Sequence, residues 1–366
     1  MKREKRRSSK KKITFFAKIS FLVFTLCFLA YVASRQSAVV ADFLNSTVCF
    51  EFRRVMASFT DSLQFSLFEI LVALIPLWIF LVIYLAVRAF KRGRAIRYTV
   101  NLFAVVLLVL SEYILSLGIA YNTTPLSSSL RLPSTEVTED KLASVMISLR
   151  DEVNELSRSV TYLDDGSSVP SYTFRDASEH ITSSFDEVFS KYDLGENFYS
   201  HAKPIHFGNV MSYFRLTGIY TFYTGEANVN SAYPMYDMVF TAAHELSHQR
   251  GILRENEANF MAYLVCSSSD DVYLRYSGAL SMYEYIASAL YRTNKDRYLE
   301  IASGLYDAPR GDILASSAVT QKYGDTFLAD ISNFLNDLFL KSNGTAGVVT
   351  YGMVVELTVS YFEERK

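Results

Sequence analysis

The stretch AAHELSHQRGILRENEANF, residues 242–260, contains two histidines four residues apart, with a glutamate directly after the first one. On a helix, His244 and His248 lie on one face about one turn apart, where two imidazoles can bind a single tetrahedral Zn²⁺. Glu245 is rotated by about 100° and can act on a water molecule without binding the metal itself. The pattern therefore predicts a zinc centre with His244 and His248 as ligands and Glu245 as the catalytic base.

The second half of this stretch offers the third ligand that a catalytic zinc site requires. Gly251 predicts a turn between two helices, and Glu255 and Glu257 begin the second helix. Glu255 shares its helix face with small residues that allow close packing against the first helix, so we expect Glu255 to be the third ligand. Glu257 or a more distant residue is the alternative, and a glutamate that is not a ligand still complements the helix dipole. Asn259, one turn beyond Glu255, is expected to hold a ligating side chain.

The residues before the motif bear on whether this helix is buried or solvated. MVFTAA, residues 238–243, is apolar and small, which favours a buried helix that brings polar groups to an interior cleft. The competing interpretation is a structural helix that matches the zinc pattern by chance. The remaining histidines, His180, His201 and His206, are expected to be structural or at the surface.

Three long apolar stretches precede this region, at residues 13–33, 66–87 and 99–120. They contribute to a mean hydropathy of +0.13, which is high for a soluble protein. Each is long enough to cross a hydrocarbon core of ~30 Å as a helix, and polar residues are too sparse to form a solvent face. The first stretch is longer than a signal-peptide core, so we expect an anchor. The chain is therefore predicted to contain a membrane anchor, 1–121, and a second domain, 122–366.

Basic residues predict the orientation of this anchor. The first twelve residues carry eight Lys or Arg, and residues 88–97 carry five and no acid. Lys and Arg beside spans favour the cytoplasmic side. We therefore expect a multi-pass protein of the cell membrane with a cytoplasmic N-terminus and an extracytoplasmic C-terminal domain. Residues 1–97 carry an excess of positive charge, but the whole chain has a net charge of −2. The part after residue 97 is therefore acidic, which disfavours nucleic acid as a partner. The expected partners are the lipid bilayer and a peptide or protein substrate.

The second domain is predicted to be mostly helical, with one small sheet at most. IYTFYTG, residues 219–225, is the best strand candidate, and as a wall of the cleft it would bind an extended peptide by β-addition. Glu226, Asn228 and Asn230 follow it and either shape that cleft or form a turn. Helical periodicity predicts helices near residues 135–159, 175–191, 236–250, 254–267, 270–292, 295–304, 311–340 and 349–363.

Two further features of the sequence carry alternatives. Glu112 lies deep in the third apolar stretch. It is either a functional carboxylate or a partner of Lys18 or of hydroxyls between the helices. Cys49 and Cys266 can both lie outside the membrane and form one disulfide. Cys266 falls on an apolar helix, however, so we expect a free core cysteine instead.

Sequence runs on both sides of the zinc motif resemble a known family. They include GEANVN (225–230), RYSGAL (275–280) and TYGMVVEL (350–357), and the resemblance spans nearly the whole chain. The family consists of bacterial membrane proteins catalogued only as a domain of unknown function, whose members resemble zinc metallopeptidases of the HExxH-plus-Glu (gluzincin) type. The resemblance implies a mainly α protein in which three N-terminal transmembrane helices precede a zincin-like domain, with Glu255 binding Zn²⁺.

The predicted reaction is metal-assisted hydrolysis by a membrane-anchored zinc metallopeptidase. Zinc lowers the pKa of a water molecule and polarises a carbonyl, and Glu245 accepts the proton of the water and delivers it to the leaving amine. A Tyr, His or Arg across the cleft is expected to stabilise the oxyanion, with Tyr276 and Tyr351 as candidates. Two alternatives stay open, namely a zinc amidase acting on cell-wall peptides and a non-catalytic, zinc-stabilised membrane scaffold or sensor.

Overall fold

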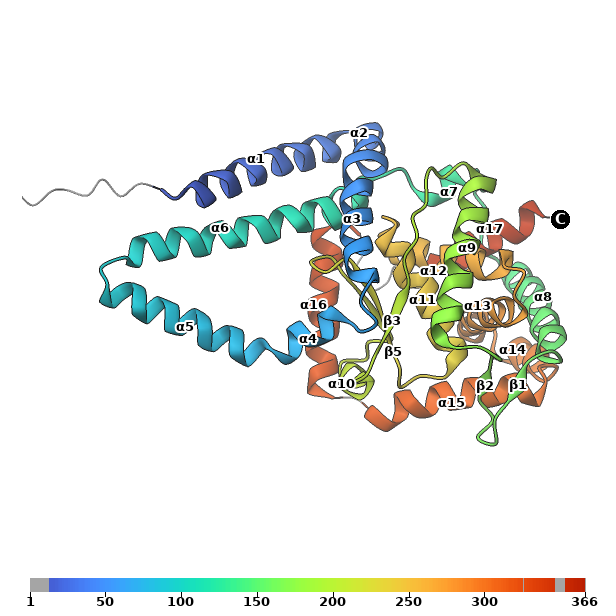
Figure 1. Cartoon of the computed structure of the whole chain (residues 1–366). Coiled ribbons are helices and arrows are strands. Elements are labelled where there is room, and N and C mark those ends of the chain that lie inside the picture. The colour runs from blue at the N-terminus through green and yellow to red at the C-terminus, as the bar shows by residue number, and fades with distance from the viewer. Residues whose placement is uncertain (1–12, 325, 346–352, 366) are drawn as a thin grey trace, which may run out of the picture.

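The computed structural model describes residues 13–324, 326–345 and 353–365, and it is mainly helical, as predicted. Three helices extend from one side of a helical domain: α1 (Phe15–Gln36), α5 (Ile75–Lys91) and α6 (Ala95–Tyr113) (Figure 1). Two helices are long and apolar enough to cross a membrane, namely α1 and the continuous helix Ala95–Asn122. The latter comprises α6, η2 (Ile114–Gly118) and η3 (Ala120–Asn122).

The second predicted span is broken into two helices. α4 (Leu67–Ala73) and α5 meet at a bend of 57°. Pro76 lies in the first turn of α5, where it has no backbone N–H to donate to the preceding turn. The chain therefore has two candidate spans among the described residues, or three if α4 and α5 together form one. The predicted spans are thus confirmed as long apolar helices for the first and third stretches, and the second stretch forms a bent pair of helices.

The segment between the first two apolar stretches is helical and packs on the domain. It forms α2 (Ala38–Leu44), the π-helical η1 (Asn45–Cys49) and α3 (Phe50–Asp61). Arg53 of α3 is buried and donates to the backbone carbonyl of Asn45 at 3.1 Å and to its side-chain oxygen at 2.9 Å. α3 runs beside the sheet of the domain, so contacts cross the predicted boundary between residues 121 and 122 (Figure 1).

The main sheet has three strands in the order β3-β5-β4. β5 (Glu226–Asn230) is central and buried along its whole length, with β3 (Ala202–Ile205) parallel to it and β4 (Gly218–Thr221) antiparallel. β4 confirms the predicted strand in its first half. Glu226, Asn228 and Asn230, for which either a role in shaping the cleft or a turn was predicted, belong to this central strand. A second, two-stranded sheet pairs β1 (Thr161–Tyr162) with β2 (Ser168–Val169).

Eleven helices of the described residues complete the domain, and most match the predicted ranges. They are α7 (Leu126–Ser129), α8 (Glu139–Ser157), α9 (Phe174–Tyr192), α10 (Gly208–Tyr213), α11 (Met235–Gln249), α12 (Glu255–Ser268), α13 (Val272–Thr293), α14 (Lys295–Ala302), α15 (Asp307–Tyr323), α16 (Phe327–Ser342) and α17 (Val354–Glu364). The helix predicted over 311–340 is interrupted after Tyr323 by Gly324, which has a φ of +55°. A positive φ ends a helix, because only glycine adopts it at little cost.

Neither of the two pairings considered for the cysteines and for Glu112 is formed among the described residues. Cys27, Cys49 and Cys266 are all free and buried, with Cys27 and Cys49 in one apolar cluster and Cys266 in the core of the domain. The disulfide between Cys49 and Cys266 is therefore not formed. Glu112 forms no ion pair with Lys18 within the part of the chain that the structure describes.

Candidate metal centre

The two histidines and Glu255 come from two helices that meet at a tight turn. His244 and His248 project from α11, and Glu255 begins α12. Gly251 makes the turn with a φ of +90°, and its N–H donates to the carbonyl of His248 at 2.9 Å. A Cβ atom on Gly251 would lie 2.5 Å from Nη2 of Arg53, so the turn needs glycine both for conformation and for space. The predicted turn is confirmed.

The three side chains converge, and the distances from Glu255 to the two imidazoles are close to those between ligands of a tetrahedral zinc site. Oε2 of Glu255 lies 3.3 Å from Nε2 of His244 and 3.6 Å from Nε2 of His248, and one ligand atom of each residue lies within 4.8 Å of the others. Bonds of ~2.0–2.1 Å to a tetrahedral zinc place two ligand atoms ~3.3–3.4 Å apart. A charge-assisted hydrogen bond would instead be about 2.7–2.9 Å long. The donor set and its spacing therefore fit a zinc ion better than a direct ion pair.

Hydrogen bonds orient one of the two imidazoles. Nδ1 of His248 lies 2.9 Å from the carbonyl oxygen of Ile252, which can accept its proton, so the ring is held with Nε2 facing Glu255. Nδ1 of His244 is buried and has no hydrogen-bond partner among the described residues. The same holds for Nδ2 of Asn259, which lines the same cleft. The predicted role of Asn259 in holding a ligand is therefore not seen as a hydrogen bond.

Charge in the centre favours an ionised carboxylate between two imidazoles. Burial acts to raise the pKa of Glu255, but His248 and His244 outweigh it and hold this pKa well below its usual range. Burial acts to lower the pKa of His248, but the Glu255 carboxylate outweighs it and raises this pKa to about 9. The three groups thus form a buried site that stabilises positive charge at its centre, as a divalent cation requires.

Glu257 points to a different part of the molecule. Its Oε1 accepts from the backbone N–H of Leu126 at 2.9 Å, and both of its carboxylate oxygens accept from Nη1 of Arg254 at 3.0 and 3.1 Å. Nη2 of Arg254 donates in turn to the carbonyls of Tyr121 and Thr123. Glu257 therefore fixes the chain that leaves the last apolar helix, and of the two glutamates only Glu255 reaches the histidines.

Glu245 lies beside the cluster and against the edge strand. Its side chain lines the cleft, and burial raises the pKa of its carboxyl while the neighbouring imidazoles oppose the shift. A Cβ atom on Gly218 would lie 2.5 Å from Oε1 of Glu245 and 2.6 Å from Cγ2 of Thr241. Gly218 therefore allows β4 to approach α11 directly over the predicted base. β4 pairs with β5 alone among the described strands, so its outer edge borders the cleft.

One cleft of about 1060 Å³ holds the centre and extends to the ends of the apolar helices. His244, His248 and Glu255 line it, together with Leu117 and Tyr121 of the Ala95–Asn122 helix. α13 contributes a face that sequence reasoning missed: Ser281, Glu284, Tyr285 and Ser288. Their spacing of three and four residues is a helical stripe, which is the signal that could have identified them.

The tyrosine predicted to stabilise an oxyanion lies elsewhere. Tyr276 is buried away from the cleft and donates to Oδ2 of Asp312 at 2.7 Å. Tyr285 lies nine positions later, on the opposite face of α13, and it lines the cleft. Burial and the charge of Glu255 both raise the pKa of Tyr285, so its hydroxyl stays protonated and can donate. Tyr351, the second candidate, lies outside the described residues.

An acidic pair on the cleft wall was also missed. Asp237 on α11 and Glu284 on α13 both line the cleft. Burial raises the pKa of Asp237 to about 6, and burial together with the charge of Asp237 raises the pKa of Glu284 to about 8. Tyr236 donates to Oε2 of Glu284 at 3.2 Å. This end of the cleft therefore carries negative charge when both carboxyls are ionised at alkaline pH, and it loses that charge as they become protonated at acidic pH.

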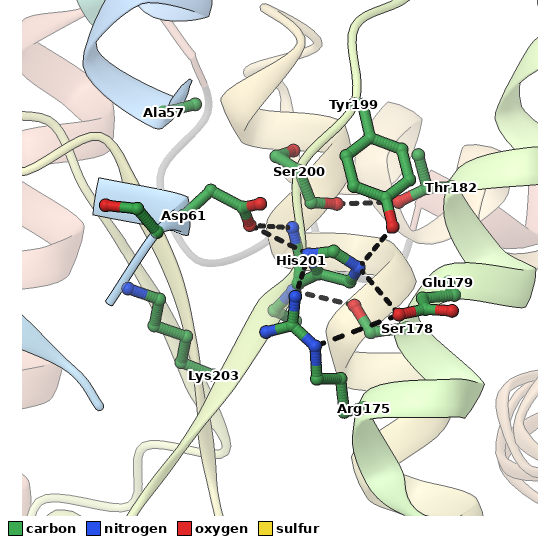
Figure 2. A network of polar contacts seen from close by, with 12 residues as sticks. Ala57, Asp61, Arg175, Ser178, Glu179, Thr182, Tyr199, Ser200, His201 and Lys203 are labelled. Atoms are coloured by element: carbon green, nitrogen blue, oxygen red, sulfur yellow. Dashed lines mark hydrogen bonds and ion pairs between the residues drawn. The ribbon is translucent and has the colours of Figure 1, made fainter. Parts of the chain in front are cut away.

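The other histidines do not join the centre. His201 is buried and links three elements, as Figure 2 shows, with its backbone N–H 2.8 Å and its Nδ1 2.9 Å from Oδ1 of Asp61. Tyr199 hydroxyl lies 2.9 Å from its Nε2. His180 contacts the ring of Tyr172, and His206 lies at the surface. The prediction that these histidines are structural or exposed agrees with their positions.

Comparison with known proteins identifies the family of this chain. No curated protein and no solved structure matches this chain. A family model described as "Protein of unknown function (DUF3810)" matches residues 46–359. Since this match covers most of the chain, the protein belongs to the DUF3810 family, as the sequence resemblance predicted.

Proposed function

We propose that this protein is a membrane-anchored, zinc-dependent metallopeptidase that hydrolyses peptide or protein substrates. The observation that carries the proposal is the spacing of 3.3 and 3.6 Å between Glu255 and the two imidazoles, with Glu245 beside them in one cleft. A zinc-stabilised scaffold would need the three ligands but would have no use for a buried carboxylate at Glu245. The position of Glu245 therefore favours a hydrolase.

His244, His248 and Glu255 would hold the zinc ion. Bound zinc would act as a Lewis acid toward a carbonyl and a water molecule. Glu245 would accept a proton from the attacking water and deliver it to the leaving amine, a role that suits a carboxyl whose pKa is raised by burial. The protonated hydroxyl of Tyr285 would donate a hydrogen bond to the developing oxyanion.

The edge of β4 would bind the substrate. β4 begins at Gly218 directly over Glu245, and its outer edge borders the cleft. An extended peptide that pairs with this edge would pass alongside Glu245, with main-chain hydrogen bonds providing affinity. This arrangement favours an extended polypeptide over a compact small molecule as the substrate.

The domain would lie outside the cytoplasmic membrane. The basic connection that follows α5 contains Arg92 and Arg94, and it lies at the end of the apolar helices far from the domain (Figure 1). Basic residues beside spans favour the cytoplasmic face. The domain at the opposite end of these helices would then act on extracytoplasmic substrates.

Metal content and hydrolysis of matched variants test this function. Purified wild type should contain one zinc per chain, and His244→Ala and Glu255→Ala should lose it. Glu257→Gln serves as the control for Glu255 and should keep zinc. Glu245→Gln should keep zinc and lose hydrolysis of a peptide library. Zinc loss in Glu245→Gln, or an inactive wild type with zinc bound, would refute the catalytic role.

A further inference from the structure

α16 has an apolar face that the described part of the chain leaves uncovered. Phe327 is 77% exposed, Phe334 67% and Leu338 56%. Leu328, Ile331 and Leu335 extend the same stripe at helical spacing. Asn333 lies on another face, Asp330 borders the stripe, and Lys341, seven residues after Phe334, ends it at the last turn of the helix. Single exposed apolar side chains are ordinary, but a contiguous stripe of this size marks a surface that is covered in the working protein.

The position of α16 indicates what covers it. The ring of Phe339 packs edge-on against Tyr113 and Tyr121, with centroids 6.2 and 6.1 Å apart. The Tyr113 hydroxyl also donates to Oδ1 of Asn343 at 2.8 Å. These contacts hold α16 at the domain end of the Ala95–Asn122 helix. Figure 1 shows that α16 runs across the direction of α1 and α6, as a helix lying along a membrane surface would.

We propose that α16 is an interfacial helix whose apolar face lies in the lipid monolayer at the domain end of the spans. The apolar helix that α16 contacts also exposes apolar side chains, such as Phe103 of α6, which is 58% exposed. Tyr113 lies at the junction, where the amphipathic ring of tyrosine favours the headgroup level. An amphipathic helix with aromatic and leucine residues on one face and charges on the other is typical of this placement.

The same helix forms a wall of the cleft that contains the metal centre. Ile331, Leu335 and Phe339 line the cleft from α16, and Leu117 and Tyr121 line it from the end of the Ala95–Asn122 helix. With α16 in the monolayer, the cleft opens at the bilayer surface. A polypeptide that leaves the bilayer beside α16 enters the cleft directly.

This placement assigns a substrate class, a step that rests on the proposed peptidase function. The substrate is a polypeptide tethered to the membrane by a lipid or by its own spanning helix, and it is cut near the membrane surface. Tethering confines the substrate to the layer in which the cleft opens, which raises its effective concentration there.

Site-specific fluorescence tests the position of α16 without any substrate. Phe334→Cys and Leu338→Cys are labelled with an environment-sensitive dye in the full chain reconstituted into lipid nanodiscs. Leu314→Cys on α15, where Leu314 is 69% exposed, is the matched control. The native cysteines are buried, and labelled wild type gives the background. Spin-labelled lipid should quench the dye on α16 and aqueous iodide should quench the dye at 314. Iodide quenching at 334 equal to that at 314 would overturn the proposal. So would protection from both quenchers, which would indicate a second copy or another protein on this face.

A paired hydrolysis assay tests the substrate class. One peptide sequence that the enzyme cleaves is presented either free or attached to a lipid in the same vesicles. The tethered form should be cleaved on the order of tenfold faster or more at equal bulk concentration. Phe334→Asp with Leu338→Asp should lower cleavage of the tethered peptide while zinc content and cleavage of the free peptide stay unchanged. Equal rates for both peptides would overturn the substrate class and leave the peptidase proposal intact. Failure to cleave any peptide, with zinc bound, would overturn the peptidase proposal and the substrate class together, while the quenching result would still decide where α16 lies.

Discussion

Replacement of Lys203 by methionine should reveal how firmly the apolar helices are joined to the domain. Nζ of Lys203 is buried and donates to Oε1 of Glu226 at 2.8 Å and to the carbonyls of Thr60 and Phe65 at 2.6 and 3.2 Å. Glu226 also accepts from the backbone N–H groups of Leu67 and Phe68, each at 2.9 Å, at the start of α4. One buried ion pair thus ties α3, α4 and the central strand together.

The size of the effect follows from these contacts. Removing one partner of a buried ion pair costs about 3–5 kcal/mol, because the other charge stays buried without compensation. Glu226 keeps two backbone donors in Lys203→Met, which favours the lower end of that range. We therefore expect a loss of about 3 kcal/mol in the free energy of unfolding. Adding Glu226→Gln removes the buried charge and should recover a measurable part of this loss, so the two changes should not be additive.

Denaturant titration in mixed micelles, followed by circular dichroism, measures this double-mutant cycle. Lys295→Met is the control, since Lys295 is exposed and its replacement should change stability by no more than about 0.5 kcal/mol. A loss below about 1 kcal/mol in Lys203→Met would refute the reasoning, because such a value is typical of an exposed pair. Strict additivity of the two substitutions would refute it as well.

Three further predictions concern the cleft. Gly218→Ala places a Cβ atom 2.5 Å from Oε1 of Glu245, which must move by roughly 1 Å, so hydrolysis should fall on the order of 10²-fold with zinc content unchanged; a variant with more than a tenth of wild-type activity would contradict this. The pKa of Glu284 is about 8 in the folded protein against an unperturbed value of 4.5, so the folded state binds this proton more tightly. Wild type should therefore lose stability as pH rises from about 4.5 through 8. Glu284→Gln should lose less between these values in thermal unfolding, and equal slopes would argue against the assignment. Tyr285→Phe should lower kcat by about 10²-fold with little change in KM, whereas Tyr276→Phe should lower thermal stability and spare the rate constant; the reverse pattern would exclude Tyr285 as the oxyanion donor.

The convergence of His244, His248 and Glu255 was predictable because their spacing in the sequence is local. His244 and His248 need only a helix between them, and Gly251 marks where that helix ends, so the return of Glu255 follows from a turn of known geometry. The choice between Glu255 and Glu257 was not decided by sequence alone. It depends on Arg254 and on the N–H of Leu126, which lies more than a hundred residues away.

Features that depend on distant contacts were predicted less well. Sequence reasoning predicted no structure for the segment before α4, yet Arg53 and Asp61 within it contact the domain. Glu226 was left between a cleft role and a turn because its partner Lys203 comes from another strand. The broken second span carried a usable signal in Pro76, which hydropathy averages ignore.

The contact between Gly251 and Arg53 bears on how such a protein can evolve and be dissected. The turn that joins α11 and α12 is packed against the side chain of Arg53, which lies between the first two apolar stretches. Exchange of the anchor for an unrelated one, a common route by which enzymes change their location, would remove one wall of that turn. We therefore expect no contiguous soluble fragment beginning after residue 122 to retain the intact centre.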